Sequence, residues 1–194
     1  MIAKTLSFIT DLLNQELKMS FGLTDDRVIA SSLINPDGSI TNNVENKIVV
    51  SVINLEHETT RKSMNHYIND GVKSYGKIAP PVQLNVYLLV SANYDSSNYL
   101  EANKMLSAVI GVFQANPFFN KETNPEMQAP LEKLTLEIFN LPINELSHIW
   151  SGIGAKYVPS IIYKTRMLAI QEEKIKKLVP GVSGLRGGAK PNQK

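Results

Sequence analysis

The sequence predicts an α+β fold: a mixed, mostly antiparallel sheet packed by two to three helices. Two observations carry this prediction. Apolar residues recur at helical spacing near the N-terminus, and several later segments are rich in β-branched residues. The predicted elements also follow one another in the order helix, strands, helix, strand, helix, strand, which favours α+β. We expect one domain over residues 1–172 and a flexible basic tail containing glycine and proline over residues 173–194.

The N-terminal segment has the pattern of an amphipathic helix. Its apolar positions fall three or four residues apart over residues 2–20, at Leu6, Ile9, Leu13 and Leu17, and Gly22 is placed to end the helix. A short strand is expected at 28–30. The Asn-Pro-Asp-Gly run at 35–38 then predicts a turn.

Two strands and a helix are predicted in the middle of the chain. Residues 47–55 are mostly β-branched, which is typical of a central strand, and residues 82–90 change from alternation to a buried apolar run. Residues 95–98 supply N-cap side chains for a helix over 99–113. Asn116-Pro117 ends that helix, because the residue before a proline avoids helical geometry.

The C-terminal half begins with a proline-bearing connection at 117–130. The alternation over 131–139 predicts a half-buried strand, and residues 146–153 predict a short helix closed by Gly152 or Gly154. Residues 157–170 are expected to form the last strand, with alternate residues from Ile161 to Ala169 on one face.

Two polar segments lie outside this pattern. Residues 56–80 show no apolar period and are expected to form a long exposed loop or arm, and loops of this length are often functional. Residues 171–194 are charged and then rich in glycine and proline, as in a flexible tail. We expect both segments to contact partners through charged and aromatic side chains: Glu56, Glu58, Arg61, Lys62, Tyr67, Lys174, Lys176, Lys177 and Arg186.

Composition narrows the class of partner. The chain has 194 residues, a net charge of +2 and no cysteine, so disulfides and thiolate metal sites are excluded. The charge balance argues against nucleic acid or an anionic membrane as the main partner. No aromatic residue accompanies the cations of the tail, so bases would have no stacking platform. The N-terminal apolar stretch is broken by polar residues, and we expect neither a signal peptide nor a membrane span.

No residue pattern in the chain indicates catalysis. The three histidines, His57, His66 and His148, are not spaced as metal-ligand pairs. No serine lies in a nucleophile elbow. The glycines at 152–154 follow a helix, whereas a phosphate loop follows a strand, and the glycines at 181–188 lack the Gly-Lys-Ser/Thr ending. We therefore predict no catalytic residue, cofactor, metal or small-molecule substrate.

The most distinctive stretch begins at Trp150 and continues to the Pro-Ser-x-x-Tyr sequence at 159–163. It resembles a signature of the tail-terminator, or cap, proteins of phage-tail-like contractile injection systems, which include antifeeding-prophage-like particles. The Asp-Leu-Leu-Asn run at 11–14 and the segment 85–113 also resemble that family. The likeness covers residues 1 to about 180.

This resemblance implies a fold similar to that of phage tail terminators and a structural function. It implies a homo-hexamer, a ring of about six copies, that closes the distal end of the inner tube and binds the last sheath layer. The expected partners are therefore the inner tube protein and the sheath protein. Assembly is expected in the bacterial cytoplasm, as part of an intracellular or released particle.

The residues of the signature itself are expected to hold the fold rather than to contact partners. In this interpretation Trp150 anchors the short helix on the sheet, Pro159 shapes the entry to the strand, and Tyr163 packs within the sheet. Two other functions stay open at this point. The chain could be another structural or adaptor subunit of the same machine, such as a baseplate component, or a small α+β enzyme.

Overall fold

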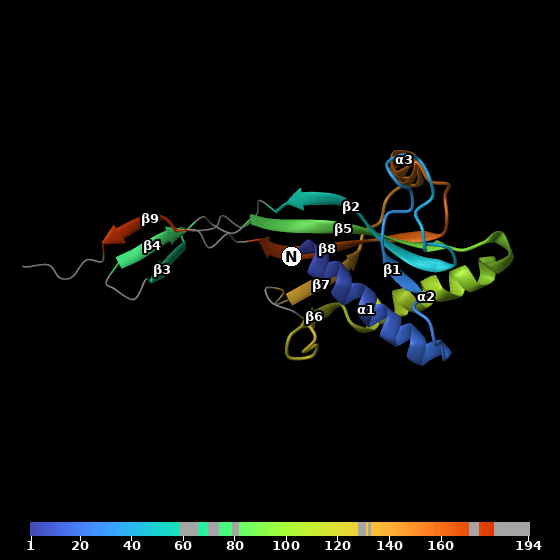
Figure 1. Ribbon diagram of the computed structural model, residues 1–194, viewed down its shortest axis with the longest axis horizontal. Coiled ribbons are helices and arrows are strands. Elements are labelled where there is room, and N and C mark those ends of the chain that lie inside the picture. The colour runs from blue at the N-terminus through green and yellow to red at the C-terminus, as the bar shows by residue number, and fades with distance from the viewer. Residues whose placement is uncertain are drawn as a thin grey trace, which may run out of the picture. The chain divides into compact units, whose positions relative to one another are not determined.

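A six-stranded mixed sheet with helices on both faces forms the first of two units in the computed structural model (Figure 1). Unit 1 comprises Met1–Glu58 and Gln83–Leu168, and unit 2 comprises Thr59–Val82 and Ala169–Lys194. The structure describes residues 1–58, 66–69, 74–78, 82–127, 131, 133–170 and 175–180. The α+β class and the mostly antiparallel sheet predicted from the sequence are confirmed.

The sheet of unit 1 has the order β1-β2-β5-β8-β7-β6. Its strands are β1 (Val28–Ala30), β2 (Lys47–His57), β5 (Val82–Asn93), β6 (Phe118–Asn120), β7 (Lys133–Ile138) and β8 (Ser160–Ile170). Strand β1 pairs with β2 in parallel, whereas the pairs β2–β5, β6–β7 and β7–β8 are antiparallel. Figure 1 shows β1 and β2 at one margin of the sheet and β6 at the other.

Three α-helices of unit 1 pack on this sheet: α1 (Ile2–Phe21), α2 (Tyr99–Ala115) and α3 (Ile143–Ile153). A single turn of 3-10 helix, η1 (Ser96–Asn98), leads into α2. Helix α1 ends at Gly22, whose φ of 62° is left-handed, and Gly154 ends α3 in the same way with a φ of 77°. Glycine suits both positions because it has no Cβ to oppose a positive φ.

The larger apolar core lies between the sheet and the helices α1 and α2. Ile9 and Leu13 of α1 are fully buried there, and burying each contributes roughly 1.5–3 kcal/mol. Phe8 meets Phe119 of β6 edge to face, with ring centroids 5.5 Å apart. We call this side of the sheet the α1/α2 face. These contacts tie the N-terminal helix to the far margin of the sheet.

A smaller core lies under α3, on the opposite side of the sheet, which we call the α3 face. Its buried members are Leu33, Val44, Val49, Tyr87, Leu89, Trp150 and Ile162. Helix α3 has 11 residues and covers only part of this face. The strands continue beyond the helix, and their side chains there are polar.

Unit 2 contains a three-stranded antiparallel sheet of order β3-β4-β9. Its strands are β3 (His66–Asn69), β4 (Ser74–Ile78) and β9 (Ile175–Pro180). Our predictions of a loop throughout 56–80 and of a flexible tail from 173 onward are therefore wrong for these strands. Strand β4 pairs with β9, which lies about 100 residues later in the sequence, from Ser74↔Pro180 to Ile78↔Ile175. A strand that is stabilised by such a distant partner cannot be recognised from the pattern of its own residues.

The other predicted elements are present, but several have different bounds; β5 ends at Asn93 rather than 90, and α3 begins at Ile143 rather than 146. Strand β2 continues to His57, two residues past the predicted end. Strand β6 lies within the expected connection at 117–130, where three residues are too few to show a period. Strand β8 begins at Ser160 and is followed by β9, so it is not the last strand.

Candidate functional site

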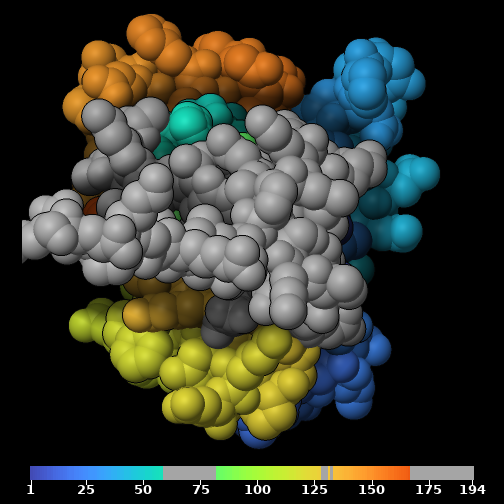
Figure 2. Space-filling model, turned by 90° about the vertical axis from the view of Figure 1, so that its left-hand side faces the viewer, coloured from blue at the N-terminus to red at the C-terminus, as the bar shows by residue number. Residues whose placement is uncertain are grey.

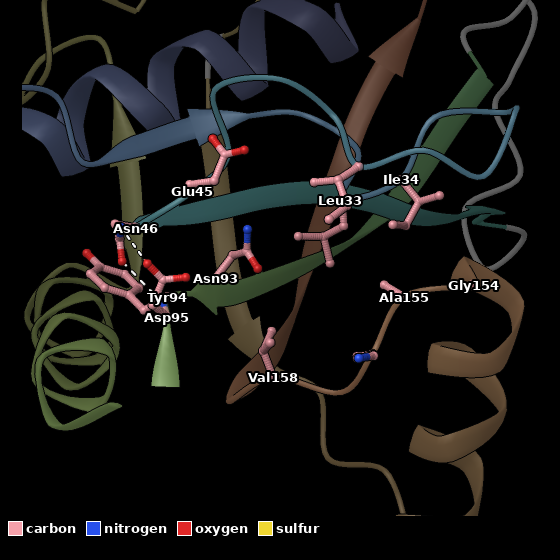
Figure 3. Close-up of a pocket in the computed structure, with 12 residues that line it drawn as sticks. Leu33, Ile34, Glu45, Asn46, Asn93, Tyr94, Asp95, Gly154, Ala155 and Val158 are labelled. Carbon is pink, nitrogen blue, oxygen red and sulfur yellow. Dashed lines mark hydrogen bonds between the residues drawn. The ribbon is translucent and has the colours of Figure 1, made fainter. Parts of the chain in front are cut away.

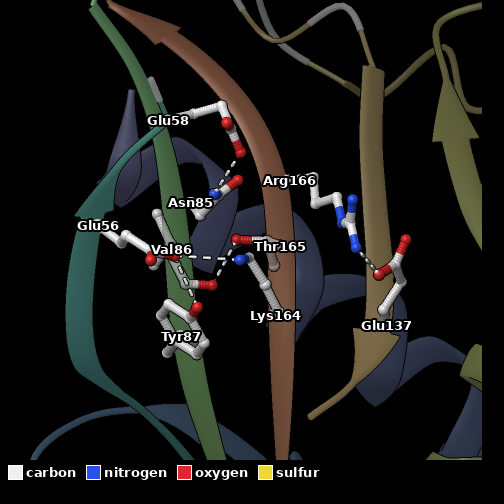
Figure 4. A network of polar contacts seen from close by, with 9 residues as sticks. All are labelled: Glu56, Glu58, Asn85, Val86, Tyr87, Glu137, Lys164, Thr165 and Arg166. Atoms are coloured by element: carbon white, nitrogen blue, oxygen red, sulfur yellow. Dashed lines mark hydrogen bonds and ion pairs between the residues drawn. The ribbon is translucent and has the colours of Figure 1, made fainter. Parts of the chain in front are cut away.

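Polar side chains form a continuous row across four strands of the α3 face, beyond the end of α3 (Figure 4). Figure 4 shows them projecting from β2, β5, β8 and β7 in that order. We call this set the charged row, and its members are Glu56, Glu58, Asn85, Tyr87, Glu137, Lys164 and Arg166. Each alternates along its strand with residues that face the other side of the sheet.

Glu56 is the centre of the best-connected part of the row. Its Oε2 accepts a hydrogen bond from the Tyr87 hydroxyl at 2.7 Å and from the Lys164 Nζ at 3.0 Å. The Lys164 ammonium also lies 5.2 Å from the centroid of the Tyr87 ring, within the range of a cation–π contact. Three neighbouring strands are thereby joined through one carboxylate oxygen.

These contacts hold both charged groups in their ionised forms. The hydrogen bond from Tyr87, followed by that from Lys164, lowers the pKa of the Glu56 carboxyl. Hydrogen bonds with Tyr87 and then Glu56 raise the pKa of the Lys164 ammonium. A carboxylate with a lowered pKa is a poor general base, and an ammonium with a raised pKa is a poor general acid. This pair therefore suits a charged contact surface better than proton transfer.

Two further contacts extend the row on either side. The Asn85 Nδ2 donates to the Glu58 Oε2 at 2.9 Å, and the Arg166 Nη2 lies 2.7 Å from the Glu137 Oε2. The side chains of Glu137 and Arg166 are about half exposed, at 45% and 50%. At that exposure water screens the pair, which contributes little to stability. Its charges are accessible to a partner protein.

The strands that carry the charged row are fixed by buried contacts on the α1/α2 face of the sheet. The Thr165 hydroxyl is fully buried and donates to the backbone oxygen of Val86 at 2.9 Å, which joins β8 to β5. Tyr163, two residues earlier on the same face, meets Phe113 of α2 edge to face at 4.8 Å. The charged row therefore stands on a rigid part of the sheet, as a binding surface requires.

A cavity of about 460 Å³ lies near the opposite end of the sheet (Figure 3). Its lining includes the apolar side chains of Leu33, Ile34 and Val158, and Asn46 and Asp95 stand at one side. Figure 3 shows these two polar residues turned toward each other: the Asp95 N–H donates to the Asn46 Oδ1 at 3.2 Å. Their hydrogen-bonding groups are thus largely used within the protein, and they do not converge on a substrate.

The described residues contain neither a cluster of metal-ligand side chains nor a membrane-spanning helix. Within these ranges, no three histidine, cysteine, aspartate or glutamate side chains gather closely enough to hold a metal ion. Among the same residues, no helix combines the length and the apolar character needed to cross a membrane.

The three residues of the sequence signature lie inside unit 1. Trp150 is only 4% exposed and packs in the core under α3, with its ring 5.5 Å from that of Tyr157. Tyr163 is buried against Phe113. The backbone oxygen of Pro159 accepts a hydrogen bond from the Ala92 N–H at 2.9 Å, which places the start of β8 beside the end of β5.

The structure places two of the nine predicted contact residues together, because Glu56 and Glu58 both belong to the charged row. Tyr67 lies on β3, and Lys176 and Lys177 lie on β9; their backbone is described and their side chains are not. The remaining four fall outside the described residues: Arg61, Lys62, Lys174 and Arg186.

Sequence reasoning missed the other five members of the row: Asn85, Tyr87, Glu137, Lys164 and Arg166. A signal was present, because Lys164 and Arg166 alternate with Tyr163 and Thr165 in a strand that we had predicted. Alternation of charged and buried residues indicates a strand with one open face. Which strands lie beside it depends on the sheet order, and the sequence pattern does not contain that order.

Comparison with known proteins supplies the remaining evidence. A model of the family described as the Pvc16 N-terminal domain matches residues 5–183. No curated protein sequence matches the chain.

Two solved structures share the fold. One is a cryo-EM structure of an extracellular contractile injection system, described as the PVC sheath/tube terminator in the extended state, with a TM-score of 0.66 and 12% identity. The other is described as the anti-feeding prophage cap, a tube-terminating cap, with a TM-score of 0.59 and 15% identity. The alignments cover 100% and 96% of this chain, and 64% and 62% of the two solved chains. This chain therefore spans less than two thirds of the length of either.

Proposed function

Because the chain belongs to the Pvc16 N-terminal domain family, we propose that it is a structural cap of a contractile injection particle. In this role it closes the end of the inner tube distal to the baseplate and holds the last layer of the sheath. The observation that carries the proposal is the fold match over the full length of the chain to a protein described as a sheath/tube terminator.

The proposed assembly is a homo-hexameric ring whose partners are the tube protein and the sheath protein. A ring needs two different surfaces on each subunit, so that each copy binds the next one head to tail. The two margins of the unit 1 sheet are formed by different strands, β1 and β2 at one and β6 and β7 at the other, which supports such an arrangement. The charged row supports a further contact with a protein partner, since its ion pairs are accessible and rigidly held.

We further propose that the chain has no catalytic activity. Two properties of the described residues support this. The most connected polar group, Glu56, is held ionised by Tyr87 and Lys164, and the cavity beside Asn46 presents mainly apolar walls. The ring is proposed to assemble in the bacterial cytoplasm and to leave the cell only as part of the particle.

The direct test is binding to tube ends. The full chain, carrying a small gold label, is mixed with purified inner tubes and viewed by negative-stain electron microscopy. The proposal predicts label at one end of each tube and little along its length. Label spread evenly along the tubes, or confined to baseplate-bearing ends in assembled particles, would select a different structural role.

A further inference from the structure

Among the described residues, one margin of the unit 1 sheet leaves half of a strand without a neighbouring strand. Strand β1 pairs with β2 only from Ile48 to Val50. The Ser31 N–H then donates to the Val50 oxygen, and the Ser51 hydroxyl donates to the Ser31 oxygen. In the described part of the chain, no strand pairs with β2 on this side from Val52 to His57. Figure 2 shows the surface of β2, in teal, beside α3, in orange.

The backbone of β2 from Val52 to His57 directs some of its N–H and C=O groups away from the sheet. The Glu58 N–H donates to the backbone oxygen of Gln83 in β5, so residue 58 points its backbone toward the interior of the sheet. Because backbone groups alternate along a strand, His57 and Leu55 direct their N–H and C=O groups away from β5. The bulge between Val52 and Asn54 changes the alternation at that point.

Apolar and acidic side chains accompany these groups on opposite faces. Val52 and Leu55 are 37% and 48% exposed, and they lie on the α1/α2 face because they pair with Leu88 and Val86 of the larger core. Glu56 pairs with Asn85 and lies on the α3 face, in the charged row. We call the segment Val52–His57 the β2 edge.

Within the same described ranges, the opposite margin of the sheet also has a part without a neighbouring strand. Strand β6 pairs with β7 only from Lys133 to Thr135, and one more bond joins the Leu136 N–H to the Pro117 oxygen. Beyond that bond Ile138 is 49% exposed, and it pairs with Tyr163, which places it on the α1/α2 face. We call Phe118–Asn120 together with Ile138 the β6–β7 edge.

This second margin carries a lysine, Lys133, and an aromatic ring on the α3 face, in addition to the paired Glu137. Phe118 pairs with Thr135, which pairs with Arg166 of the charged row, so Phe118 lies on that face and is 51% exposed. The Lys133 Nζ lies 5.5 Å from the centroid of the Phe118 ring. One margin therefore shows Glu56 on the α3 face, and the other shows Lys133 and the Phe118 ring there, beside the Glu137–Arg166 ion pair.

We propose that the β2 edge of one copy joins the β6–β7 edge of the next copy, so that the sheet continues from subunit to subunit. This proposal rests on the proposed function, because it names the contact that would close the ring. Joined in this way, Leu55 and Ile138 meet on the α1/α2 face, and Glu56 and Lys133 lie on the same α3 face. A contact between two unlike margins is the kind that closes into a ring.

Pairing of the β2 edge with the β6–β7 edge of a second copy is more favourable than pairing of two β2 edges. Two β2 edges placed together would bring Glu56 of one copy close to the acidic side chains of the other, and like charges opposite each other destabilise a strand pair. Ring closure would also remove the exposed strand edges, which otherwise invite aggregation.

The first experiment uses the full chain and compares Leu55→Lys with Leu100→Lys. Both residues are exposed leucines, but Leu100 is 84% exposed on α2 and belongs to neither proposed edge. Circular dichroism first checks that both variants are folded and melt like the wild type. Light scattering should then show that Leu55→Lys weakens ring formation by roughly tenfold or more, while Leu100→Lys forms rings like the wild type.

A second experiment tests the contact by disulfide cross-linking. The chain has no cysteine of its own, so only the introduced cysteines can form disulfides. The double variant Leu55→Cys/Ile138→Cys should give a ladder of covalent oligomers on a non-reducing gel after mild oxidation. The double variant Met19→Cys/Leu100→Cys, with two exposed positions on helices, should stay mostly as single chains.

Two outcomes would overturn the inference. In the first, Leu55→Lys forms rings as well as Leu100→Lys and the cysteine ladder is absent; if label still gathers at tube ends, the cap function stands and only this interface is wrong. In the second, the wild-type chain stays monomeric both alone and on tube ends, and it then forms no edge-to-edge contact at all.

Discussion

The side chain of Asn14 on α1 binds both backbone groups of Val28 on β1. Its Oδ1 accepts the Val28 N–H at 2.8 Å, and its Nδ2 donates to the Val28 oxygen at 2.9 Å. The same Oδ1 accepts the Arg27 N–H at 2.9 Å. The Asn14 amide thus binds the outward-facing backbone groups of β1, as a neighbouring strand would do. Among the described residues, the β2 edge has no such partner.

Replacing Asn14 by alanine should destabilise unit 1. The change leaves the Val28 N–H and C=O in a partly buried place without their partner, and hydrogen bonds of this kind are worth about 1 kcal/mol each. We expect a loss of roughly 2–3 kcal/mol in the free energy of unfolding, measured by urea denaturation. Asn14→Asp should lose a different amount, because its carboxylate still accepts from both N–H groups but places an oxygen where the Nδ2 donated to the Val28 oxygen. Equal losses for the two variants would contradict this account of Asn14.

Replacing Trp150 by alanine should be more damaging, because the ring fills the core under α3 and is 4% exposed. Truncation of a buried tryptophan costs about 3–5 kcal/mol. Trp150→Phe keeps much of the packing and should cost clearly less. Urea denaturation measures both. If Trp150→Ala retained wild-type stability but failed to bind tube ends, Trp150 would be a contact residue rather than a support of the fold.

The Glu56 carboxylate should make stability depend on pH in the acid range. Its pKa is lowered from an ordinary value of 4.5 by the bonds from Tyr87 and Lys164. A lowered pKa in the folded state adds stability that is present above the ordinary pKa and is lost as the pH falls through the folded-state pKa.

The melting temperature of Glu56→Gln should therefore fall less than that of the wild type as the pH drops below 4.5. Because Glu56 is at the surface, added salt should narrow the difference. Glu45→Gln serves as a control, since Glu45 is also an exposed carboxylate. Parallel melting curves for Glu56→Gln and the wild type across this range would contradict the assigned hydrogen bonds.

The hydroxyl of Tyr163 should be dispensable for folding. It is buried and has no hydrogen-bond partner among the described residues, and burial raises its pKa from 10.0 to about 12. Tyr163→Phe keeps the edge-to-face contact with Phe113 and removes an unsatisfied polar atom. We expect unchanged stability at neutral pH, or a gain of up to about 1 kcal/mol.

Alkaline unfolding provides a second readout for the same variant. A raised pKa in the folded state means that stability is complete below pH 10 and is lost as the pH rises toward 12. Tyr163→Phe should lose less stability than the wild type over this interval. A loss of more than about 1 kcal/mol in the phenylalanine variant at neutral pH would show that the hydroxyl has a partner in solution.

The sequence allowed prediction of those elements whose burial repeats at a regular spacing. Helix α1 shows its period through Leu6 to Leu17, and β5 shows a buried run that only a central strand would carry. Strands β3, β4 and β9 could not be predicted in the same way, because they are short and find their partners far away in the sequence. From the sequence alone, these segments look like polar or basic loops rather than strands.

The candidate site was predictable only in part for a related reason. Glu56 stood out as an acidic residue in a polar stretch, but its partner Lys164 lies 108 positions away. Which side chains of β2, β5, β7 and β8 meet depends on strand order and register. The role of Asn14 was equally hidden, since an asparagine within a helix usually faces solvent.

The most direct test of the central claim is the length of the particles that form without this chain. Cells that express the complete particle, the particle without this chain, and the deletion complemented by the chain are compared by negative-stain electron microscopy. The account predicts that deletion gives tubes of uncontrolled length with incomplete sheaths, and that complementation restores one defined length. Fully sheathed particles of normal length in the deletion would contradict the proposal that this chain terminates the tube.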